Sequence, residues 1–149
     1  MSKYEEPLVH QLLQITKKYL TAFSEISQEI PLERYHYVLL LIDEHEETLT
    51  QKALTALLLV DKSYLVNMID YLTENGLVFR ETNQKDRRQQ VIKLTAKAKY
   101  FIPMIDQKFK LLNEKSFENL SKDKITAFYE VIEVLQNNLN KFNKAEVSQ

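Results

Sequence analysis

The chain contains no cysteine and only one glycine among its 149 residues. The absence of cysteine excludes disulfide bonds, cysteine-ligated zinc and cysteine-based redox sensing. A single glycine is too few for a P-loop, a dinucleotide-binding fingerprint or the G-x-S-x-G turn of serine hydrolases. The function must therefore come from residues that need neither thiol chemistry nor a glycine-rich loop.

Long apolar runs and metal-ligating clusters are also lacking. No stretch approaches the roughly 20 apolar residues needed to span a bilayer. The first ten residues, MSKYEEPLVH, do not resemble an export signal, so we expect a cytoplasmic protein without a membrane partner. The run Asp43 to Glu47 places His45 among carboxylates without helical spacing, and His10 and His36 lie on other predicted elements. We interpret that run as a solvated turn, and predict no metal, no cofactor and no enzymatic activity, because no nucleophile, base or metal cluster converges.

Composition is that of an ordinary globular protein. Apolar residues make up 44% of the chain and charged residues 28%, and a chain of this length can bury a sizeable core, so we predict a single domain over residues 1–149. The net charge is −1, but residues 50–99 hold nine Lys or Arg and five Asp or Glu, whereas the remainder holds eleven and sixteen. The centre is therefore positive and its flanks are negative, which favours nucleic-acid binding by the centre.

The segment from Asp61 to Gly76 carries the clearest helical signals. Asp61 is a good N-cap because its carboxylate can accept a backbone N–H of the first turn. Gly76 suits the residue after a helix, where the chain needs a positive φ. The predicted buried face is Leu65, Met68, Ile69 and Leu72. The predicted outer face is Lys62, Ser63, Asn67, Asp70 and Tyr71, with Tyr64 and Val66 at its margins. Short polar side chains of this kind suit a helix that reads base edges in the major groove.

Two strands with a basic turn between them are predicted next. Leu77–Asn83 and Gln89–Leu94 are rich in Val, Ile, Phe and Thr. The turn, residues 84–88, holds three cations and one carboxylate. It is either a solvated hairpin tip or, since it follows a capped amphipathic helix, a contact to phosphates and the minor groove.

Three helices are predicted before this region. Apolar residues at steps of three or four predict a first helix over Leu8–Ile30, and the almost wholly apolar run Leu32–Glu44 predicts a buried second helix. A short third helix over Thr50–Leu58 would be capped by the threonine. We expect its inner face to be Ala53, Leu54 and Leu57.

Two long helices are predicted after it, from Thr95 to about Leu120 and from Ser121 to Phe142. The first helix and the last two helices each have an apolar face, and together these faces are larger than one small core can bury. Either a helical layer within a monomer or an intertwined homodimer would cover that surface, and we expect the homodimer. The predicted fold is mainly α with a small β-hairpin wing: a winged helix-turn-helix core over residues 31–95, with dimerisation helices over 8–30 and 96–142.

Four short segments together carry a family resemblance. They are LTQKAL at 49–54, DKS at 61–63, ENGLV at 74–78, and Asp86-x-Arg88 followed after five residues by Leu94-Thr95. This combination resembles the MarR family of bacterial transcription regulators over about Leu49–Lys99. The resemblance implies a homodimer that binds a palindromic operator in double-stranded DNA, and that a small, often aromatic, effector commonly releases.

The resemblance also implies roles for single residues. Arg87, at the wing tip, would enter the minor groove, while Asp86 and Arg88 would pair and brace the wing. Two positions depart from the family pattern. Asn67 stands where many members carry an arginine on the recognition helix, which leaves the operator sequence open. Leu59 stands where the usual turn between the DNA-binding helices has glycine, so we expect a looser turn or a slightly longer helix.

The resulting hypothesis is a dimeric, sequence-specific DNA-binding regulator that acts as a repressor. The predicted DNA-contacting residues are Gln51, Lys52, Lys62, Ser63, Tyr64, Val66, Asn67, Tyr71, Lys85 and Arg87. Of these, Tyr64, Val66 and Tyr71 could equally be packing residues. The aromatic residues Tyr19, Phe23, Tyr35 and Tyr37 form either a pocket for a small aromatic effector or plain core. The alternative function is a winged-helix module that binds protein partners without recognising DNA, which Asn67 and the net charge favour.

Overall fold

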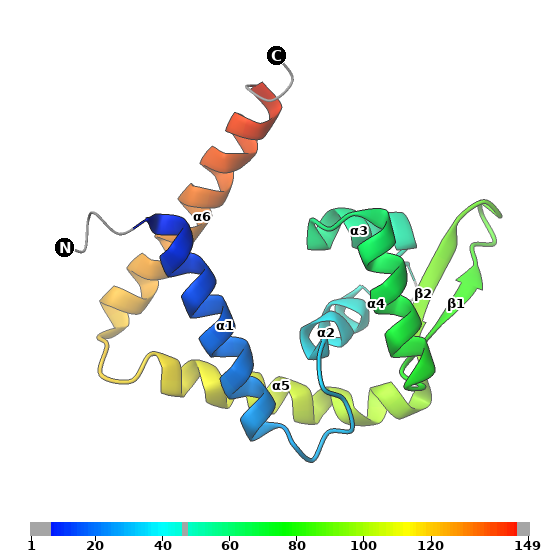
Figure 1. The fold of residues 1–149 in the computed structure, drawn as a ribbon, viewed down its shortest axis with the longest axis horizontal. Coiled ribbons are helices and arrows are strands. Elements are labelled where there is room, and N and C mark those ends of the chain that lie inside the picture. The colour runs from blue at the N-terminus through cyan, green and yellow to red at the C-terminus, as the bar shows by residue number, and fades with distance from the viewer. Residues whose placement is uncertain (1–6, 46–47, 146–149) are drawn as a thin grey trace. The chain divides into compact units, whose positions relative to one another are not determined.

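In the computed structural model, four helices are followed by an antiparallel hairpin and then by two longer helices (Figure 1). The structure describes residues 7–45 and 48–145, with side chains described up to residue 142. The elements are α1 Leu8–Ile26, α2 His36–Glu44, α3 Gln51–Leu58, α4 Lys62–Glu74, β1 Val78–Thr82, β2 Gln90–Leu94, α5 Ala96–Ser116 and α6 Lys122–Ala145. The predicted fold class, mainly α with a hairpin wing, is confirmed.

The chain divides into two compact units, Met1–Leu112 and Asn113–Gln149. The first unit holds α1 to β2 and most of α5, and the second holds the last turn of α5 together with α6. The core of the first unit draws on nearly all of its elements. Its fully buried side chains include Leu39 of α2, Leu54 of α3, Leu65 and Ile69 of α4, Ile92 of β2 and Ile105 of α5. The buried positions of α4 are the four that the sequence predicts.

The connection between α1 and α2 differs from the prediction. The first helix ends at Ile26 rather than Ile30, and the second begins at His36 rather than Leu32. Tyr35 has a φ of 71°, in the left-handed region, which interrupts any helix that would start earlier. Ile30 and Leu32 are nevertheless buried. The apolar spacing that predicted helix there therefore reflects burial of a non-helical connection in the same core.

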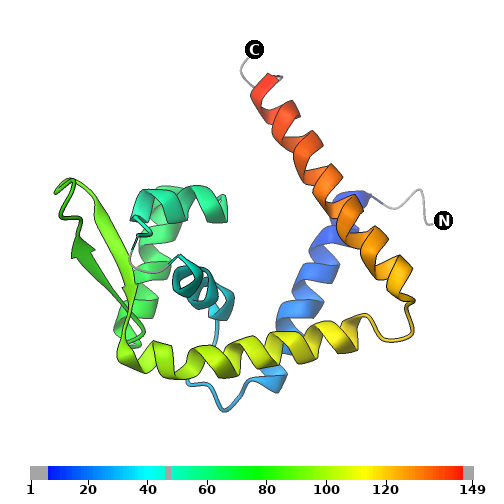
Figure 2. The ribbon, with the colours of Figure 1, turned by 180° about the vertical axis from the view of Figure 1, so that it is seen from behind.

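The hairpin has the predicted place and is slightly shorter than predicted. Its strands pair with Val78 opposite Leu94 and Thr82 opposite Gln90. The segment before α3 joins the hairpin, because the Ile92 amide donates to the Leu49 carbonyl over 2.9 Å. Figures 1 and 2 both show the hairpin extending past the helices of its unit, so that its tip is free.

Side-chain caps fix where the last two helices begin. The Thr95 hydroxyl oxygen accepts from the Ala98 amide over 3.1 Å and donates to the Gly76 carbonyl over 2.7 Å, which links the start of α5 to the end of α4. Ser121 caps α6 by accepting from the Lys124 amide over 3.2 Å. The predicted end of α5 is wrong: the helix stops at Ser116 rather than Leu120, and Asn119 has a φ of 69° in the turn that follows.

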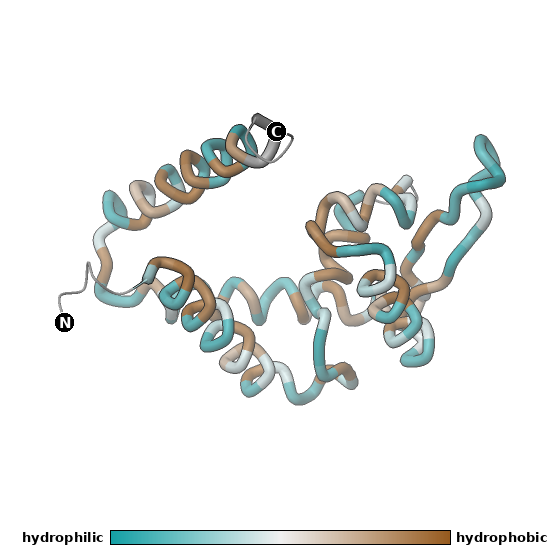
Figure 3. Tube along the Cα trace, turned by 45° about the horizontal axis from the view of Figure 1, so that its top comes forward, coloured by the Kyte–Doolittle hydropathy of each residue, from teal (hydrophilic) through white to brown (hydrophobic). Residues whose placement is uncertain are grey.

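Helix α6 carries an apolar stripe that its own unit leaves largely uncovered. Apolar and polar residues alternate along it in Figure 3. Phe117 packs against Phe128 and Tyr129, with ring centroids 5.6 and 5.7 Å apart. Of the described α6 side chains, only Ile125 and Ile132 are half-buried and the others are exposed. Along the described residues, no helix has both the length and the hydropathy to cross a membrane.

Candidate nucleic-acid interface

Helix α4 is fixed at both ends as the sequence predicts. The Asp61 carboxylate accepts from the Tyr64 amide over 2.7 Å and from the Ser63 hydroxyl over 3.2 Å. Gly76 has a φ of 72° after the last turn, and the Leu77 amide donates back to the Leu72 carbonyl over 3.0 Å. With the apolar face buried, the side chains left exposed in the first half of the helix include Lys62, Ser63 and Asn67. These are the predicted base-edge residues, and they share one helix.

The turn between α3 and α4 is tight although it contains no glycine, because Leu59 adopts the left-handed conformation that glycine usually takes there. Helix α3 ends at Leu58, and Leu59 has a φ of 56° and a ψ of 42°. The expectation of a looser turn or a longer α3 is therefore wrong. Leu59 is 89% exposed, so packing does not hold it in this conformation. The turn is instead closed by backbone hydrogen bonds, from the Leu59 amide to the Ala56 carbonyl and from the Val60 amide to the Thr55 carbonyl, both over 3.3 Å.

Helix α3 begins at a confirmed cap and buries less than predicted. The Thr50 hydroxyl accepts from the Ala53 amide over 3.0 Å. Only Leu54 is fully buried, whereas Ala53 is exposed and Leu57 is 44% exposed. The predicted inner face is therefore wrong at those two positions, because α3 is short and meets the core along a single line of side chains. Lys52 is exposed near the helix N-terminus, where anions bind readily.

An interaction network around Arg80 escaped the sequence analysis. The Arg80 guanidinium of β1 forms an ion pair with Asp70 of α4 over 2.8 Å and donates to the Gln51 side-chain oxygen of α3 over 3.3 Å. One side chain thus links β1, at the base of the wing, to both α4 and α3. Gln51 is half-buried, and its amide oxygen is already occupied by this contact. The available signal was Arg80 itself, a cation within a predicted strand.

The wing tip is organised by its own polar side chains. Asp86 accepts from the Arg88 guanidinium over 3.2 Å and from the Arg88 amide over 3.1 Å, so the predicted pair is present. Asn83 accepts from the Lys85 amide over 3.0 Å, which tightens the first half of the turn. The Arg87 side chain is exposed between these two braced halves. The tip therefore presents Arg87 on an ordered loop, and the same tip is hydrophilic in Figure 3.

Two of the predicted contacts, Tyr64 and Tyr71, have partners within the fold. The pKa of the Tyr35 phenol is raised first by burial and then by its interaction with the Tyr64 side chain. Tyr71 packs edge-on against the Tyr35 ring at 5.7 Å, and the Arg34 guanidinium lies 4.6 Å from the centre of its ring. Val66 is half-buried. The structure thus places Tyr64 and Tyr71 against α2 and its preceding loop, on the flank of α4 rather than at the centre of its exposed face.

The four aromatic residues of the predicted effector pocket are split between two places. Phe23 is buried and stacks on Phe109 with centroids 3.9 Å apart, and Tyr19 lies 6.3 Å from the same ring. Tyr35 joins Tyr64 and Tyr71, and Tyr37 lies near Tyr64, with its phenol pKa raised mainly by burial. The structure brings the four together in pairs, and an effector pocket formed by them stays a prediction.

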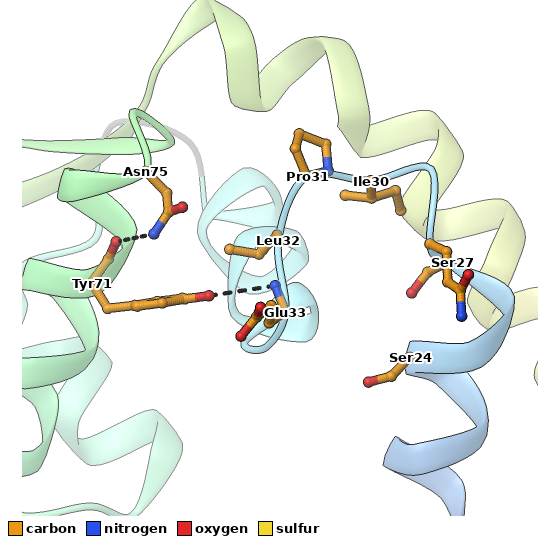
Figure 4. A pocket seen from close by; sticks show the side chains of 9 residues that line it. Ser24, Ser27, Ile30, Pro31, Leu32, Glu33, Tyr71 and Asn75 are labelled. Carbon is orange, nitrogen blue, oxygen red and sulfur yellow. Dashed lines mark hydrogen bonds between the residues drawn. The ribbon is translucent and has the colours of Figure 1, made fainter.

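A different hollow lies between α1 and α4. It has a volume of about 620 Å³, and Figure 4 shows its labelled side chains on the end of α1, the α1–α2 connection and the end of α4. Tyr71 forms part of its wall and accepts from the Glu33 amide over 3.4 Å, while Asn75 donates to the Tyr71 carbonyl over 2.8 Å. Of the four predicted pocket residues, none lines this hollow.

The acidic run around His45 gives no metal site among the described residues. Glu46 and Glu47, part of the run considered in the sequence, lie outside the described residues. The His45 ring lies 2.9 Å from the Leu41 carbonyl, through its Nδ1 atom. Across residues 7–45 and 48–145, no group of three or more histidine or carboxylate side chains is arranged to hold a metal ion.

Comparison with known proteins agrees with this geometry. Residues 30–89 match the family model described as the MarR family. A MarR protein from Peptoclostridium difficile has the same fold, with 16% identity, a TM-score of 0.83, and coverage of 98% of this chain and 96% of that chain.

Two similar structures were solved with DNA. A putative MarR family regulator from Listeria monocytogenes, complexed with a 26mer DNA, is 16% identical, with a TM-score of 0.80 and coverage of 94% and 96% of the two chains. The S. aureus MepR–DNA complex is 14% identical, with a TM-score of 0.82 and coverage of 91% and 99%. Over residues 30–89 this chain is therefore similar to the MarR family, and over nearly its whole length it has the winged helix-turn-helix fold of these structures.

Proposed function

We propose that this protein is a homodimeric transcription regulator that binds a palindromic operator and acts as a repressor in the cytoplasm. The observation that carries the proposal is that side-chain contacts join two elements suited to DNA, the exposed face of α4 and the wing. The exposed face of α4 presents Lys62, Ser63 and Asn67, and the wing tip presents Arg87. Because Arg80 bonds to both α3 and α4, helix and wing are held as one unit. A helix of this kind enters the major groove while a cationic tip reaches the adjacent minor groove.

Charge supports the same reading. The segment that carries α3, α4 and the wing has an excess of four positive charges, whereas the rest of the chain is acidic. Lys52, Lys62 and Arg87 are all exposed. Lysine and arginine side chains at such positions neutralise phosphates and release counterions, which gives affinity that falls steeply with salt. The similar structures solved with DNA support a DNA-bound role for this fold.

The homodimer is supported by apolar surface on the terminal helices. On α1, Leu8, Leu12 and Ile15 are exposed, and on α6, Val131, Val134 and Leu139 are exposed. Contiguous exposed apolar faces mark interaction surfaces in soluble proteins. A twofold dimer through these helices would present two α4 helices to one duplex, which calls for a palindromic site with half-sites about one DNA turn apart.

Release by a small aromatic effector completes the proposal. The Tyr35 side chain, at the start of α2, interacts with Tyr64 in the first turn of α4. A ligand that displaces Tyr35 would therefore act on the recognition helix directly. The dimer would exist in one state that can bind DNA and one that cannot. Such a ligand lowers the population of the first state only if it binds the second state more tightly.

Selection of bound sequences from a random duplex pool tests the proposal. The expected result is an enriched palindrome, bound by a dimer in sedimentation velocity, with an affinity that falls as salt rises. Sedimentation of the free protein as a monomer, or no enrichment together with no duplex binding at low salt, would reject it. The second of these results would favour the protein-interaction alternative.

A further inference from the structure

Asn67 occupies the centre of the exposed face of α4. With 3.6 residues per turn, it shares a stripe with Ser63 and Asp70, opposite the stripe of buried leucines that includes Leu65 and Leu72. Its side chain is exposed, and within the described chain no residue hydrogen-bonds to its amide group. Asn67 therefore has both a free donor and a free acceptor on the face of α4 opposite its buried side chains.

The other two side chains on that stripe already bond to residues of the protein. The Ser63 hydroxyl donates to the Asp61 carboxylate over 3.2 Å. Asp70 is paired with the Arg80 guanidinium over 2.8 Å. Asn67 is thus the side chain on this stripe that brings an unused donor–acceptor pair to a duplex.

Arginine is absent from α4, so the two-donor arginine fork that matches guanine has no source on this helix. The one cation in the helix is Lys62, at its first position. Two arginines contact α4 from other elements: Arg80 has its Nε on Gln51 and its Nη2 on Asp70, and Arg34 lies over the Tyr71 ring. Guanine presents two acceptors in the major groove, which match the two donors of an arginine fork, whereas adenine presents one acceptor and one donor, which match the oxygen and nitrogen of an asparagine amide.

We propose that Asn67 reads an adenine in the major groove of each operator half-site. The Asn67 oxygen accepts from the adenine N6 amino group, and the Asn67 nitrogen donates to adenine N7. This inference rests on the proposed DNA-binding function and names the base that the central position of α4 recognises. Specificity at that position is therefore for an A·T pair rather than a G·C pair.

The test uses the full-length protein and the operator obtained by selection. We expect one adenine to be fixed in each half-site. Replacing that adenine by 7-deazaadenine keeps base pairing but removes the N7 acceptor, and should weaken wild-type binding by about tenfold. The same replacement should leave the affinity of Asn67→Ala unchanged, because that variant has already lost the contact. Asn67→Arg should move the preference at that position from adenine to guanine.

The control is Gln107→Ala, which truncates an exposed amide on α5. It should retain the wild-type response to 7-deazaadenine, and all three variants should keep the wild-type thermal midpoint. An enriched operator without a fixed adenine, or an Asn67→Ala variant that still discriminates 7-deazaadenine, overturns this inference while the proposed regulator stands. Absence of binding to any duplex overturns both, so the two failures are distinguishable.

Discussion

The winged helix-turn-helix buries the apolar face of its central helix, whereas the last helix exposes its apolar residues. In α4, all four residues of the apolar face are at most 1% exposed. In α6, Val134 is 56% and Leu139 is 57% exposed. The first region closes its core with its own elements, whereas the second carries a core face without the surface that would cover it. Folding of the winged helix is therefore a property of one chain, and burial of α6 requires a second copy in the proposed dimer.

The largest effect is expected from a charge placed on α6. Leu139→Glu would put a carboxylate into the proposed interface, and twofold symmetry would place it there twice. Loss of about 1.5–3 kcal/mol of apolar burial per subunit, before any penalty for the charge, should weaken dimerisation by at least a hundredfold. Sedimentation velocity across a concentration series measures this change.

Gln136→Glu is the matched control, because it adds the same charge to an exposed polar position of the same helix. It should leave the dimer intact. Equal dimerisation constants for Leu139→Glu and wild type would show that the α6 stripe is not the interface.

The second prediction contrasts two leucines of α3. Leu54 is fully buried and Leu57 is 44% exposed. Leu54→Ala leaves a cavity in the core and should lower the free energy of unfolding by about 2–5 kcal/mol. Leu57→Ala should change it by less than about 0.5 kcal/mol, as is usual at the surface. Denaturant unfolding of both variants measures the difference, and similar losses would mean that α3 packs along a wider face.

The third prediction concerns Arg87, an exposed residue of the winged helix that would contact DNA, rather than a second subunit, in the proposed complex. Arg87→Ala should lower operator affinity by about tenfold or more and reduce the salt dependence by about one phosphate contact, without loss of the dimer or of stability. Gel-shift titration at several salt concentrations measures both quantities. Lys124→Ala, which removes an exposed cation from α6, is the control. Unchanged affinity for Arg87→Ala would remove the wing from the proposed interface.

The fourth prediction compares two left-handed residues, Gly76 with a φ of 72° and Leu59 with a φ of 56°. A Cβ at Gly76 would meet Lys97 at 3.8 Å, an ordinary contact. Gly76→Ala should therefore cost only conformational strain, about 1–2 kcal/mol. Leu59→Gly relieves the same strain but loosens the unfolded chain, so it should stabilise by up to about 1 kcal/mol. Thermal and chemical unfolding measure the free energy of unfolding of both variants. Destabilisation by Leu59→Gly would contradict the exposed position of the leucine, because it would show that the side chain makes a stabilising contact.

Signals confined to a few neighbouring residues were sufficient for much of this fold. The caps Thr50, Asp61 and Thr95 and the helix-ending Gly76 could all be predicted, because a cap is a contact within one helical turn. The Asp86–Arg88 pair, whose partners lie two residues apart, was implied by the family resemblance. Such contacts do not depend on how distant elements pack.

Contacts between distant elements were not predictable in this way. The Arg80 network joins three elements, and its partners lie 10 and 29 residues away in sequence. Tyr35 and Leu59 adopt left-handed conformations that their residue types disfavour, so propensity predicted continuing helix before α2 and a looser turn after α3. In each case tertiary packing or turn closure overrides the local preference.

The smallest expected effect is a pH dependence within the first unit, at His36. Burial lowers the pKa of His36 below its usual 6.5, and a hydrogen bond to the Leu32 carbonyl opposes that shift only in part. As the pH falls below about 6.5, the unfolded chain takes up a proton that the folded chain resists, so the unfolded state is favoured. Stability should therefore fall with falling pH from near that value down to the folded-state pKa, with a slope of at most about 1.4 kcal/mol per pH unit.

Denaturant unfolding at pH 7.5, 6.5 and 5.5 measures the slope, because these values lie above, at and below the usual histidine pKa of about 6.5. His36→Gln should flatten the slope even though it lowers stability, whereas His10→Gln, at an exposed position of α1, should retain it. An equal slope in His36→Gln and wild type would assign the acid sensitivity to other groups. The difference between the winged helix, which buries its apolar face, and α6, which exposes its own, would then involve apolar burial and no buried titratable group.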